Sequence, residues 1–192
     1  IIECCIKYNI NTLTLYAFST ENWKRPLKEV DGLLKLFSES ISTESKKIHS
    51  NNIKLKFIGD TSIFTESLQS KIKEIEKETS RNKRLILNIA LNYGGRLDIV
   101  NAVNSFYENK KNIKRITEKN INSGLYTNGQ CDVDLLIRTG GQQRMSNFLL
   151  WQSAYAELYF SKKLWPDFDE KVFVNALYFF QNTERKFGSI SN

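Results

Sequence analysis

Five short apolar runs alternate with amphipathic stretches along the chain, and this alternation constrains the fold more than any other feature. The apolar runs are LTLYAF, IKLKFIG, LILNIALN, DLLIRT and ELYF. Their Leu, Ile, Phe and Tyr content is typical of strands. Helical periodicity predicts helices over residues 30–50, 66–80, 96–109 and 170–187. Strands separated by helices predict an α/β fold with a central, mostly parallel sheet flanked by helices.

The chain has the size and composition of one domain. Its 192 residues, 41% of them hydrophobic and 12% aromatic, supply enough apolar surface for a single core. We find no internal repeat or Pro/Gly-rich linker, and we predict a single domain over residues 1–192. Residues 108–124, ENKKNIKRITEKNINSG, are the candidate flexible region because they are polar and biased in composition. The chain opens in what reads as the interior of a helix, so we expect an N-terminally truncated domain.

An excess of positive charge favours an anionic partner. The 28 Lys and Arg residues against 21 Asp and Glu residues give a net charge of +7. This charge suits nucleic acid, an acidic membrane surface or a phosphorylated small molecule. No apolar run reaches the roughly 20 residues that span a bilayer, and the opening IIECCIKYNI lacks a basic leader. We therefore predict a cytoplasmic protein.

Nucleophilic and metal-ligating residue types are scarce. Cys4, Cys5 and Cys131 have no metal-ligand spacing, which predicts reduced structural thiols. His49 is the only histidine, and its polar surroundings KKIHSNN favour a solvated helix end. These residues disfavour mechanisms that need a Ser-His-Asp or Cys-His arrangement.

Polar residues and glycines follow each of the first four predicted strands. The carboxyl ends of parallel strands lie along one edge of a sheet, where ligands bind. In chain order these residues are Ser19, Asn22 and Arg25; Gly59 and Asp60; Asn92, Gly94, Gly95 and Arg96; and Arg138, Gly140, Gly141, Arg144 and Ser146. A glycine pair before a helix lets backbone N–H groups approach phosphate oxygens, although a plain turn also explains such a pair.

The segment RTGGQQRMS carries the strongest chemical signal of the chain. Arg138 and Arg144 flank a glycine-containing loop, and Ser146 follows. This pattern favours a clamp for diphosphate, because each planar guanidinium can bind two oxygens and the hydroxyl adds a third contact. Two surface arginines in solvated ion pairs are an equally good interpretation.

Three longer segments resemble the cis-prenyltransferases, the family of undecaprenyl diphosphate synthase and dehydrodolichyl diphosphate synthase. They are LTLYAFSTENWKRP, NYGGR and DLLIRTGGQQRMSNFLLWQSAYAELYFSKKLWPDF, within a similarity that runs from Ile1 to Gly188. The resemblance implies a transferase of isoprenoid biosynthesis. Such an enzyme condenses isopentenyl diphosphate repeatedly onto an allylic diphosphate such as farnesyl diphosphate, giving a long-chain polyprenyl diphosphate. The resemblance also implies Mg²⁺ as cofactor.

The resemblance implies roles for residues of the first half of the chain. Ser19, Asn22 and Arg25 would be catalytic: Asn22 would help a proton leave the isopentenyl unit, while Ser19 and Arg25 would orient diphosphate. Trp23 would belong to a mobile loop that closes over substrate, and Glu29 would hold that loop.

The resemblance also assigns residues of the second half. Arg138, Arg144 and Ser146 would bind isopentenyl diphosphate, in agreement with the clamp. Glu157, in YAELYF, would bind magnesium or substrate. Loss of diphosphate leaves a cation-like allylic carbon while negative charge builds on the leaving group. The reaction therefore needs cationic groups at the diphosphate and an apolar wall around the carbon.

A growing isoprenoid would also need a hydrophobic tunnel. The family's tunnel positions match Ala17, Leu33, Leu36, Phe37 and Leu85, with Leu85 near the floor. The size of these residues would set the length of the product. Simple core packing is the alternative for apolar residues at helical spacing.

The chain departs from the family in two places. The family loop DGNGRW, whose Asp holds magnesium for the ionisation step, has no counterpart here. We therefore expect a fragment without that loop to be inactive. Gln142 stands where relatives usually carry Glu, which removes a negative charge beside the clamp and puts any metal role of this position in doubt.

Family members are homodimers joined through the C-terminal half. We therefore expect residues 146–160 at or near a dimer interface, with Phe148–Trp151 exposed, although core packing explains this apolar run equally well. We also expect peripheral association with a membrane when the lipid product is released.

Two further functions compete with catalysis. One is a non-catalytic partner subunit of a heteromeric cis-prenyltransferase, and the other is a basic nucleic-acid-binding α/β domain. The Lys and Arg residues are scattered and form no aromatic-interleaved stripe, so we expect no nucleic-acid partner.

Overall fold

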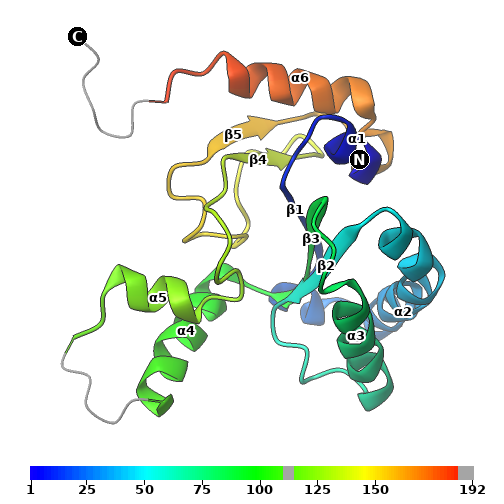
Figure 1. Ribbon diagram of the computed structural model, residues 1–192, viewed down its shortest axis with the longest axis vertical. Coiled ribbons are helices and arrows are strands. Elements are labelled where there is room, and N and C mark those ends of the chain that lie inside the picture. Colours follow the sequence, from blue (N-terminus) through cyan, green and yellow to red (C-terminus); the bar gives the residue numbers. More distant parts are fainter. Residues whose placement is uncertain (110–114, 186–192) are drawn as a thin grey trace. The chain divides into compact units, whose positions relative to one another are not determined.

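The computed structural model describes residues 1–109 and 115–185 (Figure 1). The chain divides into two compact units, Ile2–Asn128 and Gly129–Asn192, with Ile1 grouped with the latter. Each unit contains a parallel sheet, which confirms the predicted α/β class. That the two units form a single domain stays a prediction. No helix in the described ranges combines the length and the apolar character needed to cross a bilayer.

The first unit, residues 2–128, is built on a sheet with strand order β1-β3-β2 and parallel pairing throughout. Its strands are β1 (Thr12–Ser19), β2 (Ile53–Ile58) and β3 (Leu85–Tyr93). Leu85, Leu87 and Ala90 of β3 are almost completely buried, as expected for a central parallel strand covered on both faces. Because β1 and β2 run in the same direction as β3, their carboxyl ends lie at one edge of this sheet, as the sequence predicted.

Helices connect these strands in the predicted order. The helices of the first unit are α1 (Ile2–Lys7), the 3₁₀ turn η1 (Thr20–Lys24), α2 (Leu27–Ser50), α3 (Glu66–Thr79), α4 (Gly95–Asn109) and α5 (Glu118–Gly124). Both α2 and α3 contact β2 (Figure 1). In α3 the buried residues Leu68, Ile72 and Ile75 share one face, and Thr65 Oγ1 caps the helix by accepting the Leu68 N–H at 3.4 Å.

Helix α5 corrects the expectation of a flexible segment over residues 108–124. Thr117 caps this helix: its Oγ1 accepts the Asn120 N–H at 3.3 Å, and its own N–H donates to Asn120 Oδ1 at 3.0 Å. Gly124 lets α5 approach α4, since a Cβ there would lie 2.8 Å from the Cα of Ala102. The prediction of flexibility is therefore wrong for residues 118–124, while residues 110–114 lie outside the described residues.

The second unit, residues 129–192, holds a separate parallel sheet. Its elements are β4 (Leu135–Arg138), β5 (Glu157–Phe160), the 3₁₀ turn η2 (Trp165–Asp167) and α6 (Glu170–Gln181). The five predicted strands therefore form two sheets, because β4 pairs along its whole length with β5. Helix α6 begins at the cap Asp169, whose Oδ1 accepts the Val172 N–H at 3.0 Å. It ends at Gln181, six residues earlier than predicted, where the Asn182 N–H turns back to the Tyr178 carbonyl.

Candidate functional site

The end of β1 leads directly into the turn η1, which carries the predicted catalytic residues. Ser19, the last residue of β1, donates its backbone N–H to Asn22 Oδ1 at 2.8 Å. This bond closes the turn and orients the Asn22 carboxamide. Its oxygen is engaged by the backbone, while its Nδ2 has no hydrogen-bond partner among the described residues and can donate to a ligand.

Arg25 and Glu29 form an ion pair where η1 gives way to α2. Arg25 NH1 lies 2.5 Å from Glu29 Oε1, one helical turn along the chain. About half of each side chain is exposed to solvent, so the pair is of modest strength. The contact is consistent with the predicted role of Glu29 in holding the loop, and that role stays a prediction.

Trp23 joins the turn to the ends of the other two strands. Its ring packs against Phe18 of β1, with centroids 5.2 Å apart, and against Phe64 of the β2–α3 loop at 6.2 Å. Trp23 Nε1 donates to Asn92 Oδ1 at 2.9 Å, and Asn92 Nδ2 donates to the carbonyl of Asp60 at 2.8 Å. The sequence placed Asn92 and Asp60 at this edge but gave neither of them a role or a partner.

A buried tyrosine network lies on the same sheet. Tyr16 donates its hydroxyl to the Tyr93 carbonyl at 3.0 Å, and Tyr93 donates its own to Asp98 Oδ2 at 2.9 Å. The other oxygen of Asp98 accepts the Tyr126 N–H at 3.1 Å, so this buried carboxylate is fully engaged. Burial, reinforced by the Glu21 carboxylate, raises the pKa of Tyr16 to about 12. Tyr16 is therefore a neutral hydrogen-bond donor at physiological pH.

The predicted clamp residues lie together in one loop of the second unit. Arg138, at the end of β4, donates from NH1 to the Arg144 carbonyl at 2.6 Å and to Ser146 Oγ at 2.5 Å. Arg144 NH1 donates to Gln142 Oε1 at 2.6 Å. The structure thus brings all three predicted clamp residues together, because Arg138 contacts both Arg144 and Ser146 directly.

The charges of this loop are not neutralised by neighbouring acids. No carboxylate in residues 1–109 or 115–185 pairs with Arg138 or Arg144, so the interpretation as solvated ion pairs fails for the described part of the chain. Burial, with repulsion from Arg144, lowers the pKa of Arg138. Gln142 offers Arg144 a neutral acceptor where Glu would supply a counter-charge. The loop is therefore suited to an anion.

The glycines of this loop do not present their backbone N–H groups to a ligand. Gly140 and Gly141 have φ of +82° and +75°. The Gly140 N–H donates to the Lys163 carbonyl at 2.7 Å, and the Gly141 N–H donates to the Ser161 carbonyl at 2.9 Å. These bonds extend the pairing of β4 with the chain after β5. The predicted approach of this pair's N–H groups to phosphate is therefore wrong.

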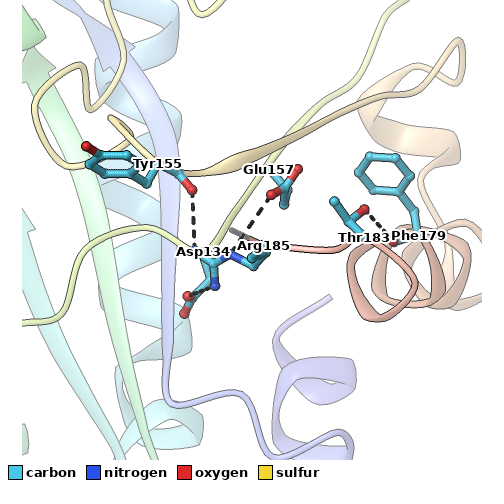
Figure 2. Close-up of polar contacts among 6 residues, drawn as sticks. All are labelled: Asp134, Tyr155, Glu157, Phe179, Thr183 and Arg185. Carbon is cyan, nitrogen blue, oxygen red and sulfur yellow. Dashed lines mark hydrogen bonds and ion pairs between the residues drawn. The ribbon is translucent and has the colours of Figure 1, made fainter. Parts of the chain in front are cut away.

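Glu157 lies at the start of β5 beside an arginine that the sequence did not single out (Figure 2). Its Oε1 is 3.9 Å from Arg185 Nε, while Arg185 NH1 is 2.7 Å from Asp134 Oδ1. Arg185 NH2 also donates to the Tyr155 carbonyl at 3.3 Å. Arg185 follows α6 by four residues. This network therefore joins the chain after the helix to the start of β5, to Tyr155 just before that strand, and to Asp134, the residue that precedes β4.

The donor set fits magnesium only in a limited way. The described ranges contain no group of three or more His, Cys, Asp or Glu side chains that could hold a metal ion. Glu157 could supply one carboxylate ligand, which suits Mg²⁺ when substrate phosphates and waters complete the octahedron. The metal role of Glu157 stays a prediction.

The predicted tunnel residues differ widely in exposure. Leu85 is completely buried, whereas Leu36 is 60% exposed and Ala17 is also exposed. Leu33 and Phe37 are half-buried. Core packing therefore does not account for Leu36 and Ala17, and a lining role for the set stays a prediction.

The apolar run Phe148–Trp151 is not exposed as expected. Leu149 is buried at 2% exposure and its neighbours in the run are half-buried, because this stretch belongs to the core of the second unit. The large apolar residues that are exposed in the predicted interface segment are instead Tyr155 and Leu158, at 68% and 38%.

The family model for prenyltransferases, described as undecaprenyl diphosphate synthase, matches residues 1–188. The chain belongs to the cis-prenyltransferase family. Two relatives of this cis-prenyltransferase are the ditrans,polycis-undecaprenyl-diphosphate synthases, farnesyl-diphosphate specific, of Haemophilus ducreyi and Pasteurella multocida. They are 52% and 53% identical over 97% and 95% of this chain, which covers 79% and 78% of theirs.

Two solved structures share the fold of this cis-prenyltransferase. A probable undecaprenyl diphosphate synthase from Campylobacter jejuni is 39% identical with a TM-score of 0.90, over 98% of this chain and 88% of the other. Lavandulyl diphosphate synthase from Lavandula x intermedia, solved with dimethylallyl diphosphate, is 35% identical with a TM-score of 0.92, over 98% of this chain and 84% of the other. Neither the non-catalytic subunit nor the nucleic-acid-binding domain finds support in these relatives.

The sequence of this cis-prenyltransferase assigned no role to three side chains that shape the candidate sites. Asn92 and Asp98 contact residues far away along the chain, and Arg185 contacts Asp134 across the second unit. Asn92 alone left a usable signal, because Asn at the end of a strand tolerates the left-handed conformation that it adopts, with φ of +48°.

Proposed function

We propose that this cis-prenyltransferase condenses isopentenyl diphosphate units onto farnesyl diphosphate to give undecaprenyl diphosphate. The observation that carries the proposal is the loop of Arg138, Arg144 and Ser146, where two guanidinium groups adjoin a hydroxyl without a carboxylate partner in the described chain. The names of the Haemophilus ducreyi and Pasteurella multocida relatives support the farnesyl starter and the undecaprenyl product. They favour this product over a dolichol precursor.

Each condensation forms one carbon–carbon bond while the allylic carbon–oxygen bond breaks and a proton leaves the isopentenyl unit. Arg25 and Ser19 orient diphosphate beside the reacting carbons. The oxygens of the departing diphosphate take up this proton. Asn22 Nδ2 would orient that diphosphate by donating to one of its oxygens, while Asn22 Oδ1 remains held by the Ser19 N–H. Trp23 closes the loop over substrate, and Glu29 steadies Arg25 through their ion pair.

Arg138, Arg144 and Ser146 bind the diphosphate of isopentenyl diphosphate. Guanidinium groups that carry no internal counter-charge gain most from an incoming diphosphate, since no existing ion pair has to break. Glu157 would hold Mg²⁺ together with diphosphate oxygens, and the bound ion supplies neutralisation of the charge that develops on diphosphate.

The product chain needs apolar surroundings. The tunnel that we propose for it is lined by Ala17, Leu33, Leu36, Phe37 and Leu85. The exposure of Leu36 and Ala17 supports a surface that contacts lipid. Each buried methylene group contributes about 0.8 kcal/mol, so a long product also favours peripheral association of the enzyme with a membrane at release.

A homodimer joined through the C-terminal half completes the proposal. Exposed Tyr155 and Leu158 lie within the segment expected at the interface, and such apolar exposure favours a partner surface.

Transfer of labelled isopentenyl diphosphate into a butanol-soluble lipid tests the proposed function. The full-length protein with Mg²⁺ and farnesyl diphosphate should incorporate label, and the lipid should elute as a C55 species. Lack of incorporation by the full-length protein would refute the proposal.

A further inference from the structure

Asn92 occupies a position that connects the turn η1 to the rest of the first unit. Its carboxamide oxygen accepts the indole N–H of Trp23 at 2.9 Å, and its amide nitrogen donates to the Asp60 carbonyl at 2.8 Å. The second bond fixes which way the amide faces, because the nitrogen must point toward Asp60. The oxygen is therefore held toward Trp23 before any ligand arrives.

The backbone around Asn92 adds to this fixation. The Asp60 N–H donates back to the Asn92 carbonyl at 3.4 Å, so the two residues are tied in both directions. Gly59 lies so close that a Cβ would be 2.1 Å from the Leu91 carbonyl oxygen. Asn92 is 5% exposed and has φ of +48°, a conformation that few residues adopt without strain.

Trp23 transmits this anchoring to the predicted catalytic residues. It lies between Asn22 and Arg25 in sequence, and its ring is held by the buried rings of Phe18 and Phe64. A side chain held by ring packing alone can still rotate or slide. The hydrogen bond to Asn92 supplies a directional contact for the indole. This contact fixes the position of the turn η1.

We propose that Asn92 is a positioning residue of the transfer reaction, acting through the indole N–H of Trp23 to hold η1 where Asn22 and Arg25 are used. This inference rests on the proposed function for its kinetic consequence. Its structural content, that Asn92 restrains Trp23, is independent of the substrate. The competing explanation is that Asn92 only stabilises the end of β3, with ring packing alone placing Trp23.

A double-mutant cycle separates these explanations. Asn92→Gly removes the carboxamide but tolerates the positive φ, and Trp23→Phe removes the indole N–H but keeps an aromatic ring against Phe18 and Phe64. Each single variant of the full-length protein should lose about 10- to 100-fold in kcat/KM, because small displacements of catalytic groups are costly. The kcat/KM of the double variant should be no lower than that of the more impaired single variant. Losses that multiply would overturn the proposal.

Asn88 provides a matched control on the same strand. It is a buried Asn whose Nδ2 donates to Thr14 Oγ1 at 3.0 Å, so Asn88→Ala also removes a buried amide from β3. This change should lower stability and should have the same effect on kcat/KM in the wild-type protein and in the Trp23→Phe variant. Asn88 pairs in register with Thr14 and Lys56 in the middle of the sheet, away from the carboxyl edge where the turn begins. Equal non-additivity at Asn88 and Asn92 would mean that the cycle reports general destabilisation, which would also overturn the proposal.

A spectroscopic measurement tests the restraint without any turnover. In a Trp151→Phe/Trp165→Phe background of the 192-residue chain Trp23 is the only tryptophan, and acrylamide quenching of its fluorescence should increase in Asn92→Gly but not in Asn88→Ala. Unchanged quenching in Asn92→Gly would refute the restraint itself. If the wild-type protein transferred no prenyl group but the quenching increased, the proposed function would fail while the restraint by Asn92 stood.

Discussion

At the scale of single residues, charge compensation distinguishes the two groups of predicted site arginines. Arg25 has the partner Glu29 at 2.5 Å, whereas among the residues that the structure describes Arg138 and Arg144 donate only to neutral oxygens of their own loop. An arginine that already carries a counter-ion contributes less to binding a new anion than one that does not. The strongest effect on diphosphate affinity is therefore expected in the loop of the second unit.

Arg138→Ala is expected to raise the KM for isopentenyl diphosphate far more than the KM for farnesyl diphosphate. Loss of one charge-assisted contact costs about 2–3 kcal/mol, which corresponds to roughly 30- to 150-fold in KM. Steady-state kinetics with each substrate varied in turn measure both constants. Arg81→Ala, which removes an exposed arginine in the turn after α3, should change neither constant. Equal increases for both substrates in Arg138→Ala would show that the clamp is wrongly assigned.

The three cysteines should differ strongly in reactivity. Cys5 is 1% exposed, and burial raises the pKa of its thiol from 9.0 to about 11, whereas Cys131 is exposed. Only the thiolate is nucleophilic, so at pH 8 iodoacetamide should alkylate Cys5 at least about tenfold more slowly than Cys131. Mass spectrometry of the native protein over time measures the order. In urea the difference should vanish, and equal rates in the native protein would contradict the buried position of Cys5.

At the scale of elements, regular periodicity made the strands and most helices predictable. The runs LILNIALN and IKLKFIG became β3 and β2 with small changes at their ends, because a buried parallel strand needs a continuous apolar sequence. The turn η1 and helix α5 were missed, since both depend on short side-chain bonds rather than on a repeating apolar pattern. The contact of Trp23 with Asn92 spans 69 residues, and no local pattern encodes such a pair.

The same limit explains the error at the glycine pair of the second unit. The sequence of Gly140 and Gly141 allows either a phosphate-binding loop or a plain turn after a strand. Their N–H groups instead pair with the chain after β5, a strand that lies far along the sequence. The positions of Arg138 and Ser146 were predictable as a local motif, while the use of the glycines depended on which strand became the neighbour of β4.

Two glycines of the first unit should respond in opposite directions to alanine. Gly59, after β2, has φ of +118° and a Cβ there would lie 2.1 Å from the Leu91 carbonyl oxygen, so Gly59→Ala should cost about 3 kcal/mol or more of unfolding free energy. Gly32 lies within α2 with nothing within 4 Å of a Cβ, so Gly32→Ala should stabilise by about 0.5–1 kcal/mol. Urea unfolding followed by circular dichroism measures both. A loss of stability in both variants would contradict the open environment of Gly32.

At the scale of the whole molecule, the fold by itself leaves the product undetermined. The chain matches a probable undecaprenyl diphosphate synthase and lavandulyl diphosphate synthase with TM-scores of 0.90 and 0.92, although the two names describe different products. One backbone therefore accommodates more than one prenyl-transfer outcome. The choice must lie in side chains, and exposed apolar residues such as Leu36 are the first candidates on this chain.

The two compact units should unfold together. Within residues 129–185 the second unit has a sheet of two four-residue strands and one α-helix of 12 residues, and an isolated sheet of this size is marginal in water. We therefore expect it to depend on the first unit for its stability. Tryptophans report the units separately, with Trp23 in the first and Trp151 and Trp165 in the second. Variants that retain only Trp23 or only Trp151 should give coincident urea transitions, equal to the transition seen by circular dichroism. A Trp151 transition at clearly lower urea would show that the units unfold independently and would contradict the prediction of a single domain.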